Sequence, residues 1–171
     1  MSDNDAKKEP RRRLGALVLV RSTDGLILLI KPTYRPGLQL PGGSVHPGEQ
    51  IADAAARELA EETGLHRRIA HHLGVDQVPA NPSTGAVEGF NFICDGGFAT
   101  DEEVGRLDRQ GVPVGAAEEV RGYAWISPDE LDAHTEPYMA ARIRAAVRAA
   151  DNGQRQPLLY IGFPAEERHA A

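Results

Sequence analysis

The sequence is poor in cysteine, and this scarcity limits the chemistry that it can support. A single cysteine, Cys94, can neither form an internal disulfide nor supply a cysteine-based zinc site. It stands in the stretch NFICDG, which is typical of a strand. We therefore expect Cys94 to be an ordinary buried thiol rather than a nucleophile.

Long apolar runs are also absent. No run approaches the roughly 18 residues that a membrane-spanning helix requires. The first residues, MSDNDAKKEPRRR, lack the apolar middle of a secretory signal. The sequence therefore predicts a cytoplasmic protein without a membrane partner.

Clustered positive charge is confined to the first residues of the chain. The formal net charge is −6, and lysine and arginine are scattered beyond residue 13. Binding to nucleic acid needs a basic face on the folded part, so we expect no stable nucleic-acid binding. Residues 1–13 are predicted to be a flexible basic tail. An acidic protein can still bind an anionic substrate if divalent cations lie between them.

The size and composition are those of one compact domain. The chain has 171 residues, of which 41% are hydrophobic, and it contains no internal repeat and no long linker. We expect a single domain over residues 14–163 and a polar C-terminal tail over residues 164–171.

The first half of the chain predicts a hairpin, a loop and a helix. Two apolar runs, 14–21 and 26–31, flank an Asp-Gly pair, which is a strong signal for an antiparallel hairpin. The proline- and glycine-rich stretch 32–43 should be a loop with at most a short strand at 38–40. Helical periodicity runs from Gln50 to Thr63, and Gly64 follows at the left-handed cap position.

The second half alternates strands, loops and helices. Residues 100–117 are predicted to be a loop with one turn of helix. Farther along, Ser127 and Glu130 have the spacing of a capping box, so a helix should start at Pro128. Strands are expected within 66–78, 87–98 and 121–127, a longer helix within 136–153, and a short strand within 156–163.

Three glutamates occupy one turn of the helix at 50–63. At about 100° per residue, Glu58, Glu61 and Glu62 form a ridge at the border of the apolar face, not opposite it. Arg57 could pair with Glu61, but one arginine cannot neutralise three carboxylates. Such clusters suit Mg²⁺, which can bridge carboxylates to substrate phosphates and activate water. Taken alone, such a spacing of glutamates favours a solvated surface with local ion pairs.

The residues around the ridge favour the metal interpretation. From Gly43 to Leu65 the chain fits G-x5-E-x7-R-E-U-x-E-E-x-G-U, where U is aliphatic, at every fixed position. This resembles the Nudix box of the Nudix hydrolases. The preceding LQLPGG resembles the usual approach to that box, although Gln39 stands where tryptophan is often found. The resemblance implies an α/β fold, a Nudix-type α/β/α sandwich with a mixed β-sheet.

The resemblance also implies roles for the matching residues. Glu58, Glu61 and Glu62 would ligate Mg²⁺ or Mn²⁺, and Glu49 would make a weaker or water-mediated contact. Arg57 would orient the cluster. Gly42 and Gly43 would face the substrate. Gly43 and Gly64 would let the backbone turn tightly, because glycine tolerates the positive φ values that tight turns need.

A general base is expected outside the box. Many members supply a loop glutamate shortly before a strand that contains an aromatic residue, and Glu118 and Glu119 precede Trp125. We prefer Glu119 as the base and expect Trp125 to pack in the core. His46 occupies a variable position, and the neighbouring His71 and His72 would point to opposite faces of a strand, so none of the three is expected to act in catalysis.

The implied activity is hydrolysis of a nucleoside diphosphate linked to another group. Pro79 and Pro82 lie roughly where some members that cleave ADP-ribose carry a proline, and a nucleoside triphosphate or another nucleotide sugar remains an alternative. A Nudix-fold binding or regulatory module with little turnover is the competing hypothesis. Because family members are often dimers, the resemblance also leaves a homodimer open.

Overall fold

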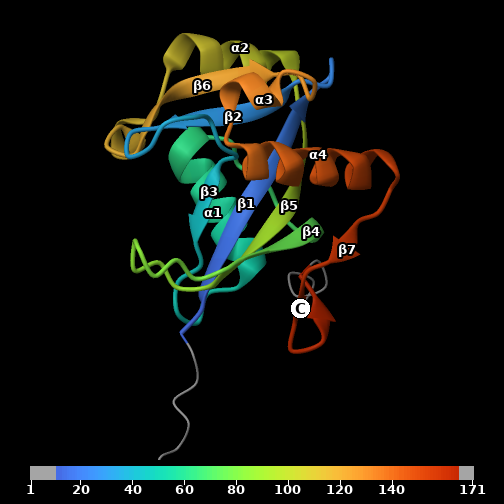
Figure 1. The fold of residues 1–171 in the computed structure, drawn as a ribbon. Helices are drawn as coiled ribbons and strands as arrows, with labels where there is room; N and C mark the ends of the chain where they lie inside the picture. The colour runs from blue at the N-terminus through green and yellow to red at the C-terminus, as the bar shows by residue number, and fades with distance from the viewer. Residues whose placement is uncertain (1–10, 166–171) are drawn as a thin grey trace, which may run out of the picture.

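A mixed β-sheet lies between two layers of helices (Figure 1). The structure, a computed structural model, describes residues 11–165. Its strands are β1 (Arg13–Ser22), β2 (Ile27–Pro32), β3 (Gly42–Ser44), β4 (His71–Val78), β5 (Gly89–Ala99), β6 (Val120–Ile126), β7 (Gln156–Pro157), β8 (Leu159–Tyr160) and β9 (Phe163–Pro164). Its helices are α1 (Ile51–Thr63), α2 (Asp101–Gln110), α3 (Leu131–His134) and α4 (Pro137–Asp151), with a 3₁₀ turn at Val114–Ala116.

The main sheet has the order β6-β2-β1-β5-β4-β7, and β3 pairs with the N-terminal half of β1. Strands β1 and β5 run parallel, whereas the other neighbours are antiparallel. Strands β8 and β9 form a separate hairpin. The predicted α/β sandwich with a mixed sheet is therefore confirmed.

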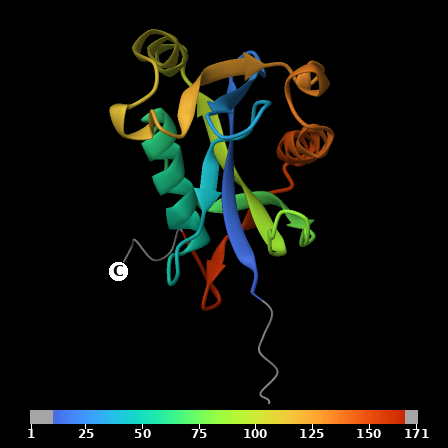
Figure 2. The same ribbon diagram turned by 60° about the vertical axis from the view of Figure 1, so that its left-hand side comes forward.

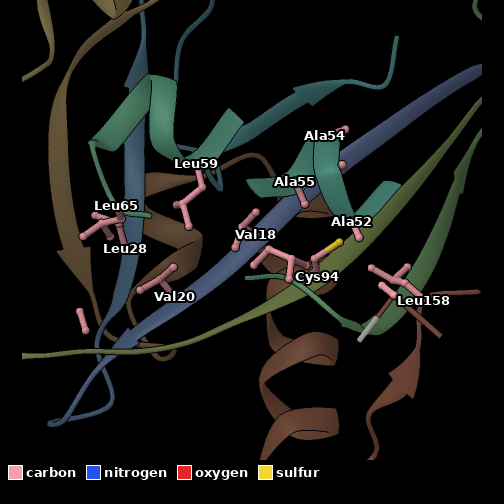
Figure 3. Packing of buried hydrophobic residues seen from close by; sticks show 14 of the residues in the cluster. Val18, Val20, Leu28, Ala52, Ala54, Ala55, Leu59, Leu65, Cys94 and Leu158 are labelled. Atoms are coloured by element: carbon pink, nitrogen blue, oxygen red, sulfur yellow. The ribbon is translucent and has the colours of Figure 1, made fainter. Parts of the chain in front are cut away.

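Strand β1 is apolar on both sides because helices cover both faces of the sheet. Its Ala16, Val18 and Val20 side chains pack with α1 and α2 in one cluster, which also holds Cys94 (Figure 3). Its Leu17 and Leu19 side chains join a second cluster with α3 and α4. Figure 2 shows α1 and α4 on opposite sides of the sheet.

The predicted hairpin is confirmed, but its strands separate quickly. Gly25 adopts φ +83° in the turn, and Arg21 pairs with Ile27. Beyond that pair, β2 leaves β1 and aligns with β6 along its whole length. The opening between β1 and β2 leaves room for β3 beside the first half of β1.

Helix α1 forms as predicted. Ala52, Ala55 and Leu59 are buried on its sheet side, and Gly64 ends it in the left-handed conformation with φ +70°. The Gly64 N–H donates to the Ala60 carbonyl at 2.8 Å, which satisfies one of the last helical acceptors.

Two sequence predictions in the second half are wrong. Residues 100–117 are not mainly loop, because Thr100 and Glu103 form a reciprocal capping box that starts the ten-residue helix α2. The helix predicted at Pro128 starts instead at Leu131. Glu130 N–H donates to the Ser127 carbonyl and the Ser127 hydroxyl accepts from Asp129 N–H, so Ser127 closes a turn instead of capping a helix.

The expected tail boundaries also need correction. Residues 1–10 and 166–171 lie outside the described part of the chain. Arg13 already belongs to β1, because its N–H donates to the Glu88 carbonyl at 2.9 Å, and Arg12 forms an ion pair with Glu88. At the other end, Pro164 lies in β9 and Ala165 is buried, with its N–H bonded to the Leu158 carbonyl.

Candidate active site

The glutamate ridge lies near the C-terminal end of α1, at the border between its buried and exposed sides. Glu62 is only 5% exposed, whereas the Glu61 side chain is 59% exposed and Glu58 lies between these extremes. Burial raises the pKa of Glu62 to about 8, with smaller contributions from the charges of Glu58, Glu119 and Glu61 and an opposing one from the Gly42 hydrogen bond. Burial likewise raises the pKa of Glu58. Glu58 and Glu62 therefore resist ionisation, because they lie close to other carboxylates and are partly removed from water.

Arg57 is the cation at the ridge. Its Nε and Nη2 atoms donate to the two oxygens of Glu49 at 2.8 and 3.0 Å, and its Nη1 donates to Glu58 at 2.9 Å and to Glu61 at 3.3 Å. These bonds hold the pKa of Glu49 down at about 2 and raise that of Arg57. Both oxygens of Glu49 are therefore committed to Arg57, whereas Glu62 has no basic partner among residues 11–165.

The described residues contain no group of three or more histidine, cysteine, aspartate or glutamate side chains that is already spaced to hold a metal ion. The guanidinium of Arg57 takes up oxygens of Glu58 and Glu61 in this arrangement. The donor set nevertheless suits a hard divalent cation, because carboxylate oxygens are its preferred ligands. A cation would also remove the penalty of burying the Glu62 charge, so the residues fit the ion that the box implies.

The two glycines of β3 lie directly against the ridge. The Gly42 N–H donates to Oε2 of Glu62 at 2.7 Å, and Gly42 adopts φ +139°. A Cβ atom at Gly43 would lie 2.5 Å from Oε1 of Glu58, so only glycine leaves room for that carboxylate. Both glycines also line a cavity of about 400 Å³ on the α4 side of the sheet.

Glu119 approaches the ridge from another part of the chain. It is exposed in the turn before β6, where its carbonyl accepts a 2.8 Å hydrogen bond from Thr33 N–H. Its negative charge contributes to the raised pKa of both Glu58 and Glu62. Glu118 is held by its carbonyl to the Thr33 hydroxyl, and its charge is not among the causes of either shift. Of the two candidates, the fold couples Glu119 to the ridge.

Tyr123 is a site residue that the sequence did not indicate. It extends from β6, and its hydroxyl donates a 2.6 Å hydrogen bond to the Glu62 carbonyl. Burial and the Glu62 charge raise its pKa to about 12, so the hydroxyl keeps its proton. Trp125, two residues farther along β6, packs against the core as expected.

The histidines do not join the ridge. His46 is exposed, and its Nδ1 atom lies 3.8 Å from Oε2 of Glu49. His71 and His72 lie on β4 and pair with β7 near the far edge of the sheet. Cys94 is fully buried, and burial raises its pKa to about 12, as expected for an inert thiol.

Among residues 11–165, no helix is both long enough and apolar enough to cross a lipid bilayer.

Comparison with known proteins agrees with the geometry. Residues 11–149 match the family described as the NUDIX domain. A Bacillus subtilis protein whose name proposes 8-oxo-dGTP diphosphatase activity is 32% identical over 122 residues, which is 68% of each chain. An ADP-ribose pyrophosphatase of Methanocaldococcus jannaschii is 41% identical over 75 residues, covering 42% of this chain and 44% of that protein.

The fold is shared with solved structures. The MutT protein of Methanosarcina mazei Go1 superposes with a TM-score of 0.64 at 22% identity, covering 86% of this chain and 99% of that one. A NUDIX hydrolase of Nitrosomonas europaea gives a TM-score of 0.63 at 21% identity, covering 89% and 99%. With the box, the family match and the fold in agreement, the chain belongs to the Nudix hydrolase family.

Proposed function

We propose that the chain is a Mg²⁺- or Mn²⁺-dependent hydrolase that cleaves the phosphoanhydride bond of a nucleoside diphosphate linked to another group. The observation that carries this proposal is the contact between the carboxylate ridge and β3. One side of β3 touches Glu58 and Glu62, and the same glycines line a cavity of about 400 Å³, large enough for a nucleoside. A substrate seated there would place its phosphates beside the ridge.

Glu58, Glu61 and Glu62 would hold the divalent cation. When bound, such an ion withdraws charge from the phosphoryl oxygens and lowers the pKa of nearby water. Glu62 is the strongest candidate, because it is buried without a basic partner in the described part of the chain and one of its oxygens is fixed by Gly42. Glu58 and Glu61 each share Arg57, so they would exchange this partner for the ion.

Arg57 and Glu49 would orient the ridge. The paired bonds from Arg57 to Glu49 fix the guanidinium plane, and Nη2 also donates to the Ser44 carbonyl at 3.2 Å. Arg57 therefore connects α1 to the loop that precedes it. In this arrangement Glu49 acts mainly through Arg57, with a water-mediated contact to the ion as its remaining role.

Glu119 would act as the general base. It takes a proton from the attacking water onto its carboxylate, while the new oxygen–phosphorus bond forms and the phosphoanhydride oxygen leaves. Its exposed position in a loop lets solvent water reach it, and its negative charge contributes to the raised pKa of both Glu58 and Glu62. Gly42 and Gly43 would form the substrate-facing backbone of β3.

The relatives leave two substrate classes open, as the sequence did. One is a nucleotide sugar such as ADP-ribose, and the other is a nucleoside triphosphate, including an oxidised one; the names of the matched proteins include both kinds. The test is a panel of nucleoside triphosphates and diphosphate derivatives with Mg²⁺, with products identified by mass. Mass also shows which bond is cut when the reaction is run in ¹⁸O-water.

The matched control is the Glu62→Gln variant, which keeps the shape of the side chain and removes its charge. We expect cleavage of at least one panel member by the unmodified protein and a loss of turnover by orders of magnitude in the variant. Binding of a nucleotide without cleavage of any would instead support a binding or regulatory module. A variant as active as the parent would overturn the proposed role of the ridge.

A further inference from the structure

The cavity beside β3 has an unusual charge for this protein. The chain as a whole carries a net charge of −6, yet none of the described residues that line the cavity is aspartate or glutamate. Three arginines line it, namely Arg13, Arg35 and Arg142. Cationic side chains therefore gather on the α4 side of β3, while the carboxylates of the ridge lie on its α1 side.

Arg35 is held in place without a carboxylate partner. Its guanidinium donates to the side-chain oxygen of Gln39, to the Tyr138 hydroxyl at 3.3 Å and toward the Met139 sulfur at 3.9 Å. Gln39 is 6% exposed, and its amide donates to the Tyr34 hydroxyl at 2.8 Å. Neutral partners thus fix the direction of the guanidinium and leave its charge uncompensated. Within residues 11–165, Arg35 forms no salt bridge.

The two other arginines differ from each other. Arg142 is neutralised, because its Nε and Nη2 atoms lie 2.6 and 2.5 Å from Oδ2 of Asp76. Arg13 has no carboxylate partner in the described part of the chain and donates to the Asn91 side-chain oxygen at 3.1 Å. Asn91 is itself 3% exposed, so it is a rigid acceptor. The cavity therefore carries two uncompensated positive charges, on Arg13 and Arg35.

A cavity for a nucleoside alone does not need these charges. A neutral base and an unmodified ribose offer no anion to a guanidinium, and the phosphates to be cleaved belong beside the ridge on the other side of β3. A guanidinium that is held by neutral partners matches a phosphoryl group, whose oxygens accept its paired N–H groups. The cavity therefore suits a substrate with a second anionic group, remote from the bond that is cut.

We propose that this cavity selects nucleotides whose ribose carries an additional phosphate, and that Arg35 binds this phosphate with support from Arg13. The inference rests on the proposed function for the location of the cleaved phosphates. It goes further by naming the part of the substrate that determines specificity. Gln39, which replaces the common tryptophan before the box, gains a role as the residue that orients Arg35.

The test is calorimetric binding of three probes in the presence of Mg²⁺: AMP, adenosine 2′,5′-bisphosphate and adenosine 3′,5′-bisphosphate. At least one bisphosphate should bind about tenfold or more tightly than AMP, as expected for a charged hydrogen bond. The arms with 2′- and 3′-phosphate distinguish the two positions on the ribose. Because no turnover is measured, this result is independent of whether the panel of substrates is hydrolysed.

Variants locate the phosphate. In Arg35→Gln the preference for the bisphosphate over AMP should fall to about twofold or less, and Arg13→Gln should reduce it partly. Arg148→Gln is the matched control, because it removes the same charge from an exposed position on α4 that does not line the cavity, and the preference should persist.

Three results would overturn the proposal. One is equal affinity of the unmodified protein for AMP and both bisphosphates, and another is absence of binding by all three. The third is an equal loss of AMP and bisphosphate affinity in Arg35→Gln, which would show that the guanidinium contacts a part common to both.

Discussion

The Tyr123 hydroxyl donates a 2.6 Å hydrogen bond to the backbone carbonyl of Glu62. This bond joins β6 to the last turn of α1, where helical carbonyls lack partners within the helix. Glu62 is thereby held at two points, since its carboxylate also accepts from Gly42 N–H at 2.7 Å. The orientation of the most buried ridge carboxylate depends on two strands that are far apart in the sequence.

Replacing Tyr123 with phenylalanine tests this support. Tyr123→Phe should cost about 1 kcal/mol of unfolding free energy for the lost hydrogen bond. It should also lower kcat several-fold with little change in KM, because Glu62 is less well positioned. Steady-state kinetics and urea denaturation measure the two effects. A change in stability alone would mean that Tyr123 supports the fold but not the site.

Stability should depend on pH through Glu62. Burial raises its pKa to about 8 in the folded state, well above the ordinary value of 4.5. The folded protein therefore holds this proton more tightly than the unfolded chain does. The stabilisation is complete below about pH 4.5 and is lost as the pH rises toward about 8. With EDTA present, unfolding free energy should fall over this window, with up to about 1.4 kcal/mol per pH unit coming from Glu62.

The same measurement on variants identifies the group and the ion. Glu62→Gln should flatten the slope, whereas Glu102→Gln, an exposed change on α2, should leave it intact. Saturating Mg²⁺ should raise the melting temperature of the unmodified protein near pH 8 more than that of Glu62→Gln. An unchanged melting temperature with Mg²⁺ and with Mn²⁺ would count against the metal site.

Changing each of the two neighbouring glycines of β3 to alanine should have a different effect, one mainly on activity and the other on stability. In Gly43→Ala the new methyl displaces the Glu58 carboxylate, because it would lie 2.5 Å from Oε1. We expect kcat/KM to fall about 10- to 100-fold with a small change in stability, since a side chain can rotate away. Gly42→Ala would place its methyl 2.2 Å from the Ala16 carbonyl oxygen at φ +139°, and should cost about 3 kcal/mol or more.

Gly74→Ala is the matched control for both changes. Its added methyl meets no atom within 4 Å, and Gly74 also lies in a strand. Activity and melting temperature should therefore stay near those of the unmodified protein. If Gly43→Ala were equally harmless, the close approach of Glu58 to β3 would not matter for catalysis.

The assignment of the base rests on Glu119. Glu119→Gln should lower kcat by about 10²-fold or more without much effect on KM, and Glu118→Gln should stay within about twofold. Normal turnover in Glu119→Gln, combined with a loss in Glu118→Gln, would move the role to the neighbouring residue.

Much of the site could be predicted because its signals are local. Helix α1 has apolar spacing, a ridge of acids and a glycine cap within about 15 residues, and each signal supports the others. Helix α2 carried an equally local signal, the capping box of Thr100 and Glu103, but Gly105 and the surrounding acids favoured a loop. Burial of Leu107 against the core decides for the helix.

The parts that could not be predicted depend on strand order. The sequence places Tyr123 on a strand, but its bond to Glu62 exists only because β6 pairs with β2 at the sheet edge near the end of α1. Arg13, Arg35 and Asn91 likewise come from three separate segments and meet only in the folded cavity. A local sequence pattern cannot show such contacts, because the pairing of β1 with β5 joins residues as far apart in the sequence as Arg13 and Gly89.

Strand β3, with only three residues, separates the carboxylates of the ridge from the cavity. Substitutions in the wall contributed by α4 and the 33–41 loop should therefore alter ligand choice, while helix α1, which carries the proposed ion-binding carboxylates on the opposite face, stays as it is. Because the two parts are separate, the preference for one nucleotide over another can change through the cavity wall while the carboxylates of α1 are retained.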